Sequence, residues 1–228
     1  MIEWIRLTTE EVQTLDRRLP VIIPLGLIEA HGSHLSLGLD NNAADYFSRR
    51  VAEAAGAILA PTLYYGFADA MREYSGTIGL TVETLSLVIR DIAVMFCQQG
   101  FNKQIYFSGH GGNRLACELG FHKAWEQVPD LQPVYWNYWT EAGFTQIHHA
   151  DKGETEIALA IGSIVYMDRA KDYTFKKPWH LVRSRYQFQP ESGGTNGFPT
   201  TADPAEGERM RDEIVLRLSE KVREIINA

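Results

Sequence analysis

The chain has 228 residues, a formal net charge of −7 and 45% hydrophobic residues. The length fits one α/β domain, and the composition is that of an ordinary globular protein, so we expect a single domain over residues 1–228. An acidic chain without a run of Lys or Arg argues against a nucleic-acid partner or an anionic membrane surface.

The first residues and the two cysteines indicate where in the cell the protein is expected to reside. The opening MIEWIRLTTEEV has early acids and lacks the apolar core of a signal peptide. No apolar run approaches the roughly 20 residues of a membrane-spanning helix. Cys97 and Cys117 both fall in helix-like segments and form no CxxC pair, which is typical of buried thiols in a reducing compartment. We therefore expect a cytoplasmic protein with no membrane partner.

Short apolar runs alternate with longer amphipathic stretches along the chain. The predicted strands cover 21–25, 57–60, 104–108 and 132–136, and the predicted helices cover 42–55, 83–99, 113–127, 154–164 and 206–226. This alternation predicts an α/β fold with a parallel sheet and helices on both of its faces. Functional groups in such folds lie beyond the carboxyl ends of the strands. Residues 186–204, rich in Gly, Pro and Thr, are predicted to form a long loop.

The first candidate motif, GLIEAHGSHLSLGLD, follows the strand at 21–25. Glu29 and His31 are two residues apart, so in extended chain both side chains lie on one face. The glycines of the motif let the chain turn back, which brings Asp40 toward the same point. A carboxylate and an imidazole at a strand end favour a divalent metal site. The alternatives are a hydrogen-bonded loop histidine for His31 and a helix N-cap for Asp40.

The second candidate motif, YFSGHGGN at residues 106–113, follows another apolar strand and opens a helix. Its glycines fit neither a Walker A loop nor GxGxxG. Tyr106 stands where a nucleophile elbow requires Gly, so Ser108 is not predicted to be a nucleophile. We predict that His110 is a metal ligand and that Asn113 orients a neighbouring group.

The third candidate segment contains His149 and, at the start of a predicted helix, Glu154. An acid at a helix start can also simply complement the helix dipole. His122 and His180 carry no pattern and are expected to be structural. In combination, the chain offers five nitrogen or oxygen ligands, more than one tetrahedral zinc needs: Glu29, His31, Asp40, His110 and Glu154. Such a set suits two metals bridged by one carboxylate, which is hydrolase chemistry.

These motifs resemble the creatininase, or creatinine amidohydrolase, family, in the branch that carries HGGN. The family block GxxExHGxHLPxxxD stands at 26–40, with Ser36 in place of proline. The GTxxL block stands at 76–80, NGHGGN at 108–113 with Ser108 for the first Asn, and HAGxxETS at 149–156. The blocks keep the family order and span about residues 20–210.

The resemblance implies a three-layer αβα sandwich with a mostly parallel central sheet. It also implies two divalent metal ions per chain, zinc or manganese and alternatively iron, and a homohexamer built as a trimer of dimers. By this resemblance Glu29 and His110 hold one metal, His31 and Glu154 hold the other, and Asp40 bridges them. His149 is the proton shuttle that serves the leaving nitrogen. His34 and Asn113 are expected to support the ligands rather than to bind metal.

The sequence also departs from creatininase itself, which carries HxE beside a tyrosine at the second motif. Here Gly111 and Gly112 follow His110, so both the tyrosine and that glutamate are absent. This departure predicts a substrate other than creatinine. Trp136 and Trp139 are candidates for aromatic walls of the substrate site, with ordinary packing of a buried strand as the alternative. The HGGN branch includes formamide-cleaving deformylases and a peptidase of peptide-cofactor maturation.

The expected function is therefore a metal-dependent amidohydrolase. It would cleave a C–N amide bond, other than a peptide bond, in a small cyclic or linear amide through a metal-bound hydroxide. One alternative is an isomerase or lyase that uses the same ions to stabilise an enolate. Another is a relative without catalytic activity that binds a small ligand.

Overall fold

The computed structural model describes residues 1–68, 71–176 and 189–228. Its centre is a five-stranded sheet in the order β1-β3-β2-β4-β5, with every neighbouring pair parallel. The strands are β1 (Ile2–Glu3), β2 (Val21–Leu25), β3 (Ile58–Leu59), β4 (Lys103–Ser108) and β5 (Gln132–Asn137).

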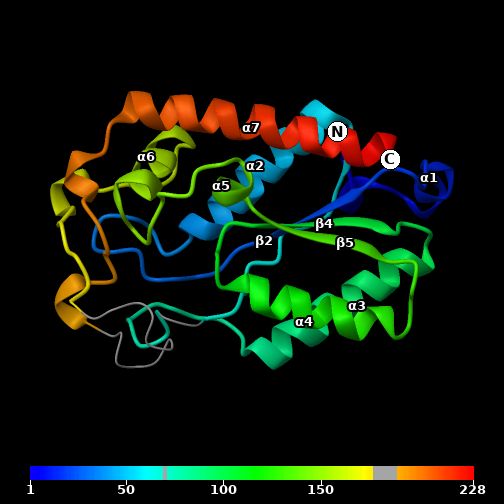
Figure 1. Cartoon of the computed structure of the whole chain (residues 1–228), viewed down its shortest axis with the longest axis horizontal. Coiled ribbons are helices and arrows are strands. Elements are labelled where there is room, and N and C mark those ends of the chain that lie inside the picture. The colour runs from blue at the N-terminus through cyan, green and yellow to red at the C-terminus, as the bar shows by residue number, and fades with distance from the viewer. Residues whose placement is uncertain (69–70, 177–188) are drawn as a thin grey trace.

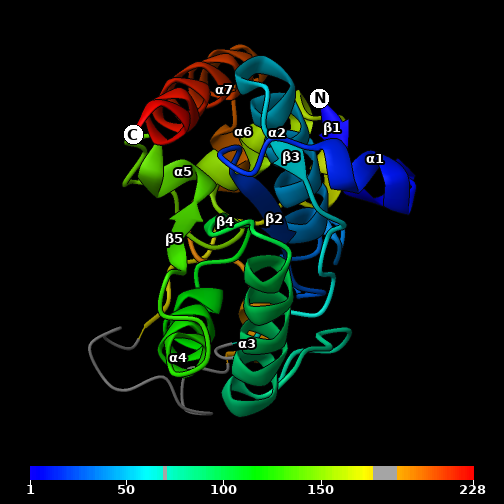
Figure 2. The same cartoon turned by 90° about the vertical axis from the view of Figure 1, so that its right-hand side faces the viewer.

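Helices cover both faces of this sheet. They are α1 (Thr9–Thr14), α2 (Leu39–Ala55), α3 (Val82–Gln98), α4 (Asn113–Trp125), α5 (Tyr138–Glu141), α6 (Lys152–Ala160) and α7 (Pro204–Asn227). Helices α3 and α4 lie on one side of the sheet, and α2 and α7 lie on the other (Figures 1 and 2). The predicted αβα sandwich is confirmed, and the sheet is parallel throughout the described strands.

The apolar run of β2 reflects burial on both faces. Val21 and Ile23 pack in the core beneath α3 and α4, whereas Ile22 packs in the second core beneath α2 and α7. All three side chains are at most 1% exposed. A central parallel strand has no solvent face, so it reads as a continuous hydrophobic segment rather than an alternating one.

The strand order changes direction between β2 and β4. From β2 the chain continues through α2 to β3 on one side, while β4 continues through α4 to β5 on the other. The winding direction therefore reverses between two adjacent strands. In open α/β sheets, ligands bind at the carboxyl ends of the strands at such a switch point.

Four helices, α2, α3, α6 and α7, begin one to three residues before their predicted starts, and two of these starts bear on the site. Helix α2 begins at Leu39 and Gly38 is its N-cap, so the alternative of Asp40 as the N-cap is wrong. Helix α6 begins at Lys152, because the Asp151 side chain caps it by accepting from the Glu154 N–H. The sequence analysis missed β1, α1 and α5, which are too short to show a period.

Gly109 allows β4 to end directly against the start of α2. A Cβ added at Gly109 would lie 2.0 Å from the Asp40 carbonyl oxygen, which belongs to helix backbone and cannot yield. We expect Gly109→Ala to destabilise the metal-free protein by about 1–3 kcal/mol in urea unfolding. Gly111→Ala is the control, because its Cβ would only reach Asn137 Nδ2 at 3.9 Å. A stability of Gly109→Ala equal to that of the control would contradict the close approach.

Candidate metal centre

The five candidate ligands come from four segments that meet at the carboxyl end of the sheet. Glu29 and His31 lie in the loop after β2, and His110 follows β4 directly. Asp40 lies in the first turn of α2, and Glu154 lies in the first turn of α6. The structure thus brings together side chains that are up to 125 residues apart at the switch point of the sheet.

Asp40 stands between two groups of ligand atoms. Its Oδ1 lies 3.1 Å from His31 Nε2, which is also 3.7 Å from Glu154 Oε2. Its Oδ2 lies 3.2 Å from His110 Nδ1, which is also 3.1 Å from Glu29 Oε2. The groups Glu29–Asp40–His110 and His31–Asp40–Glu154 each keep their ligand atoms within 4.8 Å of one another.

The unsatisfied atoms of this cluster fit divalent cations. Glu29 Oε2 and Asp40 Oδ2 are buried and receive no well-aligned hydrogen bond. A buried carboxylate oxygen without a partner costs free energy, which a coordinated cation would offset. The donor set of imidazole nitrogens and carboxylate oxygens suits zinc or manganese.

In the metal-free protein, protons compensate the charge of the carboxylates. Burial alone would lower the pKa of His31, but the Asp40 carboxylate raises this pKa to about 10. Burial likewise opposes protonation of His110, yet Glu29 raises its pKa well above the ordinary value. Burial raises the pKa of Glu154 to about 8. At neutral pH, the two imidazoles are therefore charged and Glu154 is largely protonated.

Metal uptake is therefore expected to release protons. At pH 7 we expect about two to three protons per chain, from His31, His110 and part of Glu154, since ligands must be deprotonated. Apparent metal affinity should rise with pH up to about 10, the pKa of His31. Calorimetric titration in buffers of different ionisation enthalpy measures this release. An affinity independent of pH, with no proton release, would contradict the charge state of the cluster.

Backbone carbonyls orient two of the histidines. His31 Nδ1 lies 3.0 Å from the Glu29 carbonyl, and His149 Nε2 lies 2.7 Å from the Ala30 carbonyl. The Ala30 N–H in turn donates to Thr77 Oγ1 at 3.0 Å. Because a carbonyl only accepts, these ring nitrogens carry protons. The opposite nitrogens, His31 Nε2 and His149 Nδ1, face the carboxylates.

The turn that carries His149 and Glu154 is held by Asp151, whose role the sequence analysis missed. One Asp151 oxygen accepts from the Glu154 N–H and the other accepts from the His148 N–H. The Glu154 carboxylate accepts from the Ala150 N–H at 2.5 Å, and Ala150 has a left-handed φ of 48°. The D-x-x-E spacing of a helix start could have revealed this cap.

His34 and Asn113 support the site in different ways. His34 Nε2 lies 2.9 Å from Thr155 Oγ1, which donates to the Asp151 carbonyl, so His34 acts on the start of α6. Asn113 accepts from the Phe67 N–H and donates to the Gly26 carbonyl and Ser108 Oγ. It thereby ties the ends of β2 and β4 together and contacts none of the candidate ligands directly.

The tryptophan candidates have different surroundings. Trp136 is 6% exposed and packs in the core beneath α2 and α7, with Phe107 at a centroid distance of 6.5 Å. This packing is what the buried-strand alternative expects, and a substrate contact of Trp136 stays a prediction. Trp139 is half-buried beside Tyr138 and stays a candidate for a substrate wall.

The two remaining sequence predictions concern histidines and a loop. His122 stacks edge-on to Trp125 on α4, away from the cluster. His180 and residues 186–188 of the predicted loop lie outside the described residues.

The cluster is most accessible at two histidines. The side chains of His110 and His149 are 13% and 16% exposed, whereas those of Glu29, His31, Asp40 and Glu154 are at most 7% exposed.

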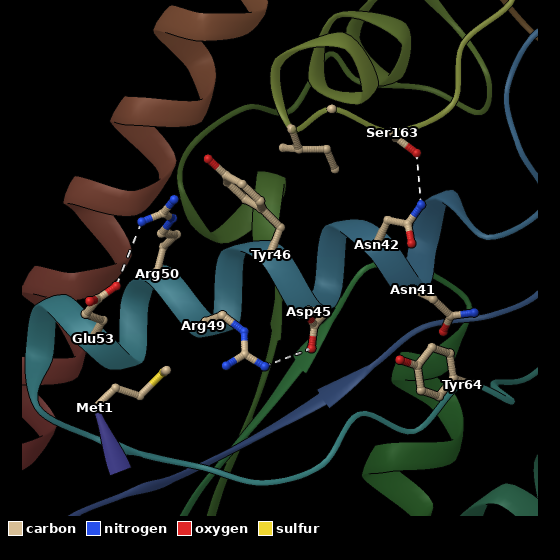
Figure 3. A pocket seen from close by; sticks show the side chains of 12 residues that line it. Met1, Asn41, Asn42, Asp45, Tyr46, Arg49, Arg50, Glu53, Tyr64 and Ser163 are labelled. Carbon is tan, nitrogen blue, oxygen red and sulfur yellow. Dashed lines mark hydrogen bonds and ion pairs between the residues drawn. The ribbon is translucent and has the colours of Figure 1, made fainter. Parts of the chain in front are cut away.

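A separate pocket of about 540 Å³ lies on the outer side of α2 (Figure 3). Its Arg49 already pairs with Glu3 and Asp45. The titratable cluster, not this pocket, is therefore the candidate functional site.

Comparisons with known proteins agree with the fold and the motifs. The creatininase family model, described as creatinine amidohydrolase, matches residues 6–222. The creatinine amidohydrolase of Pseudomonas putida is 25% identical over 232 residues, covering 90% of this chain and 88% of that protein. The mycofactocin precursor peptide peptidase of Mycobacterium ulcerans (strain Agy99) is 28% identical over 208 residues, covering 86% and 81%.

Solved creatininase structures share the architecture. A manganese form superposes with a TM-score of 0.87 at 23% identity, covering 98% of both chains. A variant of the Zn–Zn type superposes with a TM-score of 0.86 at 22% identity, covering 97% of both chains. The fold and the cluster define an α/β protein with a candidate metal centre at the carboxyl end of its sheet. The family match over nearly the whole chain shows that it belongs to the creatininase family.

Proposed function

We propose that this protein is a metal-dependent amidohydrolase that cleaves a C–N amide bond of a small molecule. The observation that carries the proposal is the shared carboxylate of Asp40, whose two oxygens face His31 and His110 separately. Glu29, Asp40 and His110 would hold one ion, and His31, Asp40 and Glu154 would hold the second. When bound, such ions lower the pKa of water and polarise a carbonyl group.

The chain's own part in the reaction is to place the ligands and to move a proton. His149 keeps its proton on Nε2, against the Ala30 carbonyl, so Nδ1 is the nitrogen that exchanges protons. In the metal-free protein, burial and the nearby charge of His31 lower the pKa of His149 to about 4, and the burial, which does not depend on the proton of His31, favours a neutral imidazole. A neutral Nδ1 can take a proton from the attacking water and pass it to the leaving nitrogen.

The proposed substrate class rests on the two residues that follow His110. Gly111 and Gly112 present no side chains there, so the tyrosine and glutamate of creatininase itself have no counterparts. This supports an amide other than creatinine, either cyclic or linear. The similarity to a mycofactocin precursor peptide peptidase extends the linear candidates to short peptides.

The test is a hydrolysis screen of the manganese-loaded and zinc-loaded protein with creatinine, N-formyl amines, cyclic ureides and short peptides. Release of amine, with one ¹⁸O atom from labelled water in the acid product, is the expected result for one of the non-creatinine classes. Turnover without ¹⁸O incorporation would replace the proposal with an isomerase or lyase. The alternative of a ligand-binding relative predicts an incomplete ligand set, whereas all five side chains converge here.

Assembly and location stay predictions from the sequence. We propose a cytoplasmic homohexamer, a trimer of dimers, on family resemblance. Within residues 1–68, 71–176 and 189–228, none of the helices combines the length and apolar character needed to cross a bilayer.

A further inference from the structure

A third group of ligand atoms overlaps the proposed centre. Glu29, His31 and His149 also keep one ligand atom each within 4.8 Å of the others. His149 Nδ1 lies 3.8 Å from Glu29 Oε2, and the rings of His31 and His149 have their centroids 4.4 Å apart. Unlike the other two groups, this one contains two imidazoles and a single carboxylate.

His149 is oriented as metal-binding histidines are. Such histidines donate the ring N–H that does not bind metal to a carbonyl or carboxylate, which fixes the tautomer and directs the other nitrogen. His149 does this through Nε2 to the Ala30 carbonyl, and His31 does it through Nδ1 to the Glu29 carbonyl. His110 lacks this feature, since its buried Nε2 has no partner among the described residues.

We propose that Glu29, His31 and His149 form an alternative zinc site. The proposal rests on the proposed function, because it concerns the same centre. His31 has one nitrogen free for metal, Nε2, since Nδ1 is committed to the Glu29 carbonyl. An ion on His31 is therefore held either with Asp40 and Glu154 or with Glu29 and His149, and the two placements exclude each other.

The nature of the ion selects between the two placements. Two histidines and a glutamate are a ligand set of catalytic zinc sites. One histidine with two carboxylates suits the harder Mn²⁺ ion. We therefore expect zinc to favour the placement on His149 and manganese the placement on Glu154. Zinc so placed occupies Nδ1 of His149, the nitrogen assigned to proton exchange, so zinc binding at this placement and proton exchange through His149 exclude each other.

The first test measures affinity without using activity. Metal-free wild type, His149→Ala and His148→Ala are titrated with Zn²⁺ and with Mn²⁺ in competition with a chromophoric chelator. His149→Ala is expected to weaken zinc binding about 10–100-fold and to leave Mn²⁺ binding nearly unchanged. His148→Ala is the matched control, because His148 is the exposed neighbour and its hydrogen bond to Asp151 is donated by its backbone N–H.

The second test counts imidazoles by X-ray absorption at the zinc edge. With two zinc ions bound, the alternative placement gives an average of about 1.5 histidines per zinc, from His110, His31 and His149. The average should fall to about 1 in His149→Ala. This readout on the wild type does not depend on how well the variant folds.

The outcomes separate the two proposals. If wild type binds both metals but His149→Ala changes neither affinity, and zinc has about one histidine on average, the alternative site is overturned while the proposed centre stands. If wild type takes up neither zinc nor manganese, the proposed centre fails and the alternative site fails with it. Selective loss of zinc affinity together with the change in imidazole count supports the alternative site.

Discussion

Asp40→Asn is expected to abolish amide hydrolysis and to weaken binding of both metal ions by about 100-fold or more. The reason is that Asp40 belongs to both ligand groups, with Oδ1 beside His31 and Oδ2 beside His110. An asparagine keeps the size of the side chain but supplies only one oxygen and no charge. Metal titration of the metal-free variant, followed by elemental analysis, measures the effect.

Asp45→Asn is the matched control for this prediction. Asp45 lies on the same helix, its side chain is 42% exposed, and its ion pair with Arg49 has a separation of 3.7 Å. Exposed pairs of this kind contribute little, so metal content and activity should match those of wild type. If Asp40→Asn kept both ions at wild-type affinity, Asp40 would not be the shared ligand.

His149→Ala is expected to keep its manganese and to lose about 10²–10⁴-fold in kcat. The side chain is absent from the two groups that hold manganese in the proposed centre, which explains the retained metal. It supplies the proton-exchanging Nδ1 at the accessible side of the cluster, which explains the lost turnover. Manganese analysis and steady-state kinetics on one preparation measure both properties.

His148→Ala is the control for this second prediction, since it removes the neighbouring imidazole and leaves the backbone contact with Asp151 in place. It should retain wild-type kcat. A kcat of His149→Ala within about threefold of wild type would remove the proton-shuttle role. Loss of manganese from His149→Ala would instead make His149 a ligand of the manganese form.

The sheet and the main helices were predictable because their hydrophobic patterns are long and local. The run at Val21–Leu25 could only be a strand buried on both faces, and α7 shows helical spacing over 24 residues. The position of the site was predictable too, since parallel strands end at one edge. Short elements such as α5, with four residues, carry no such pattern.

The candidate ligands could be named from residue patterns, whereas their grouping around two metals came only from the family resemblance. Glu29 and His31 are close in sequence, whereas their contacts with Asp40, His110 and Glu154 depend on the packing of α2 and α6 at the sheet edge. Backbone contacts, such as Ala30 with His149, leave no signature in residue type. Trp136 shows the opposite difficulty: its residue type suggests a substrate wall, but the side chain packs in the core, as aromatic residues near a motif more often do.

The central claim is that two divalent ions share Asp40, and the most direct measurement is the metal content of the protein. Elemental analysis of untagged protein, purified without added metal and then titrated with zinc and manganese, is expected to give about two ions per chain. No bound metal, and no uptake of either ion on titration, would contradict the claim and the hydrolase proposal with it.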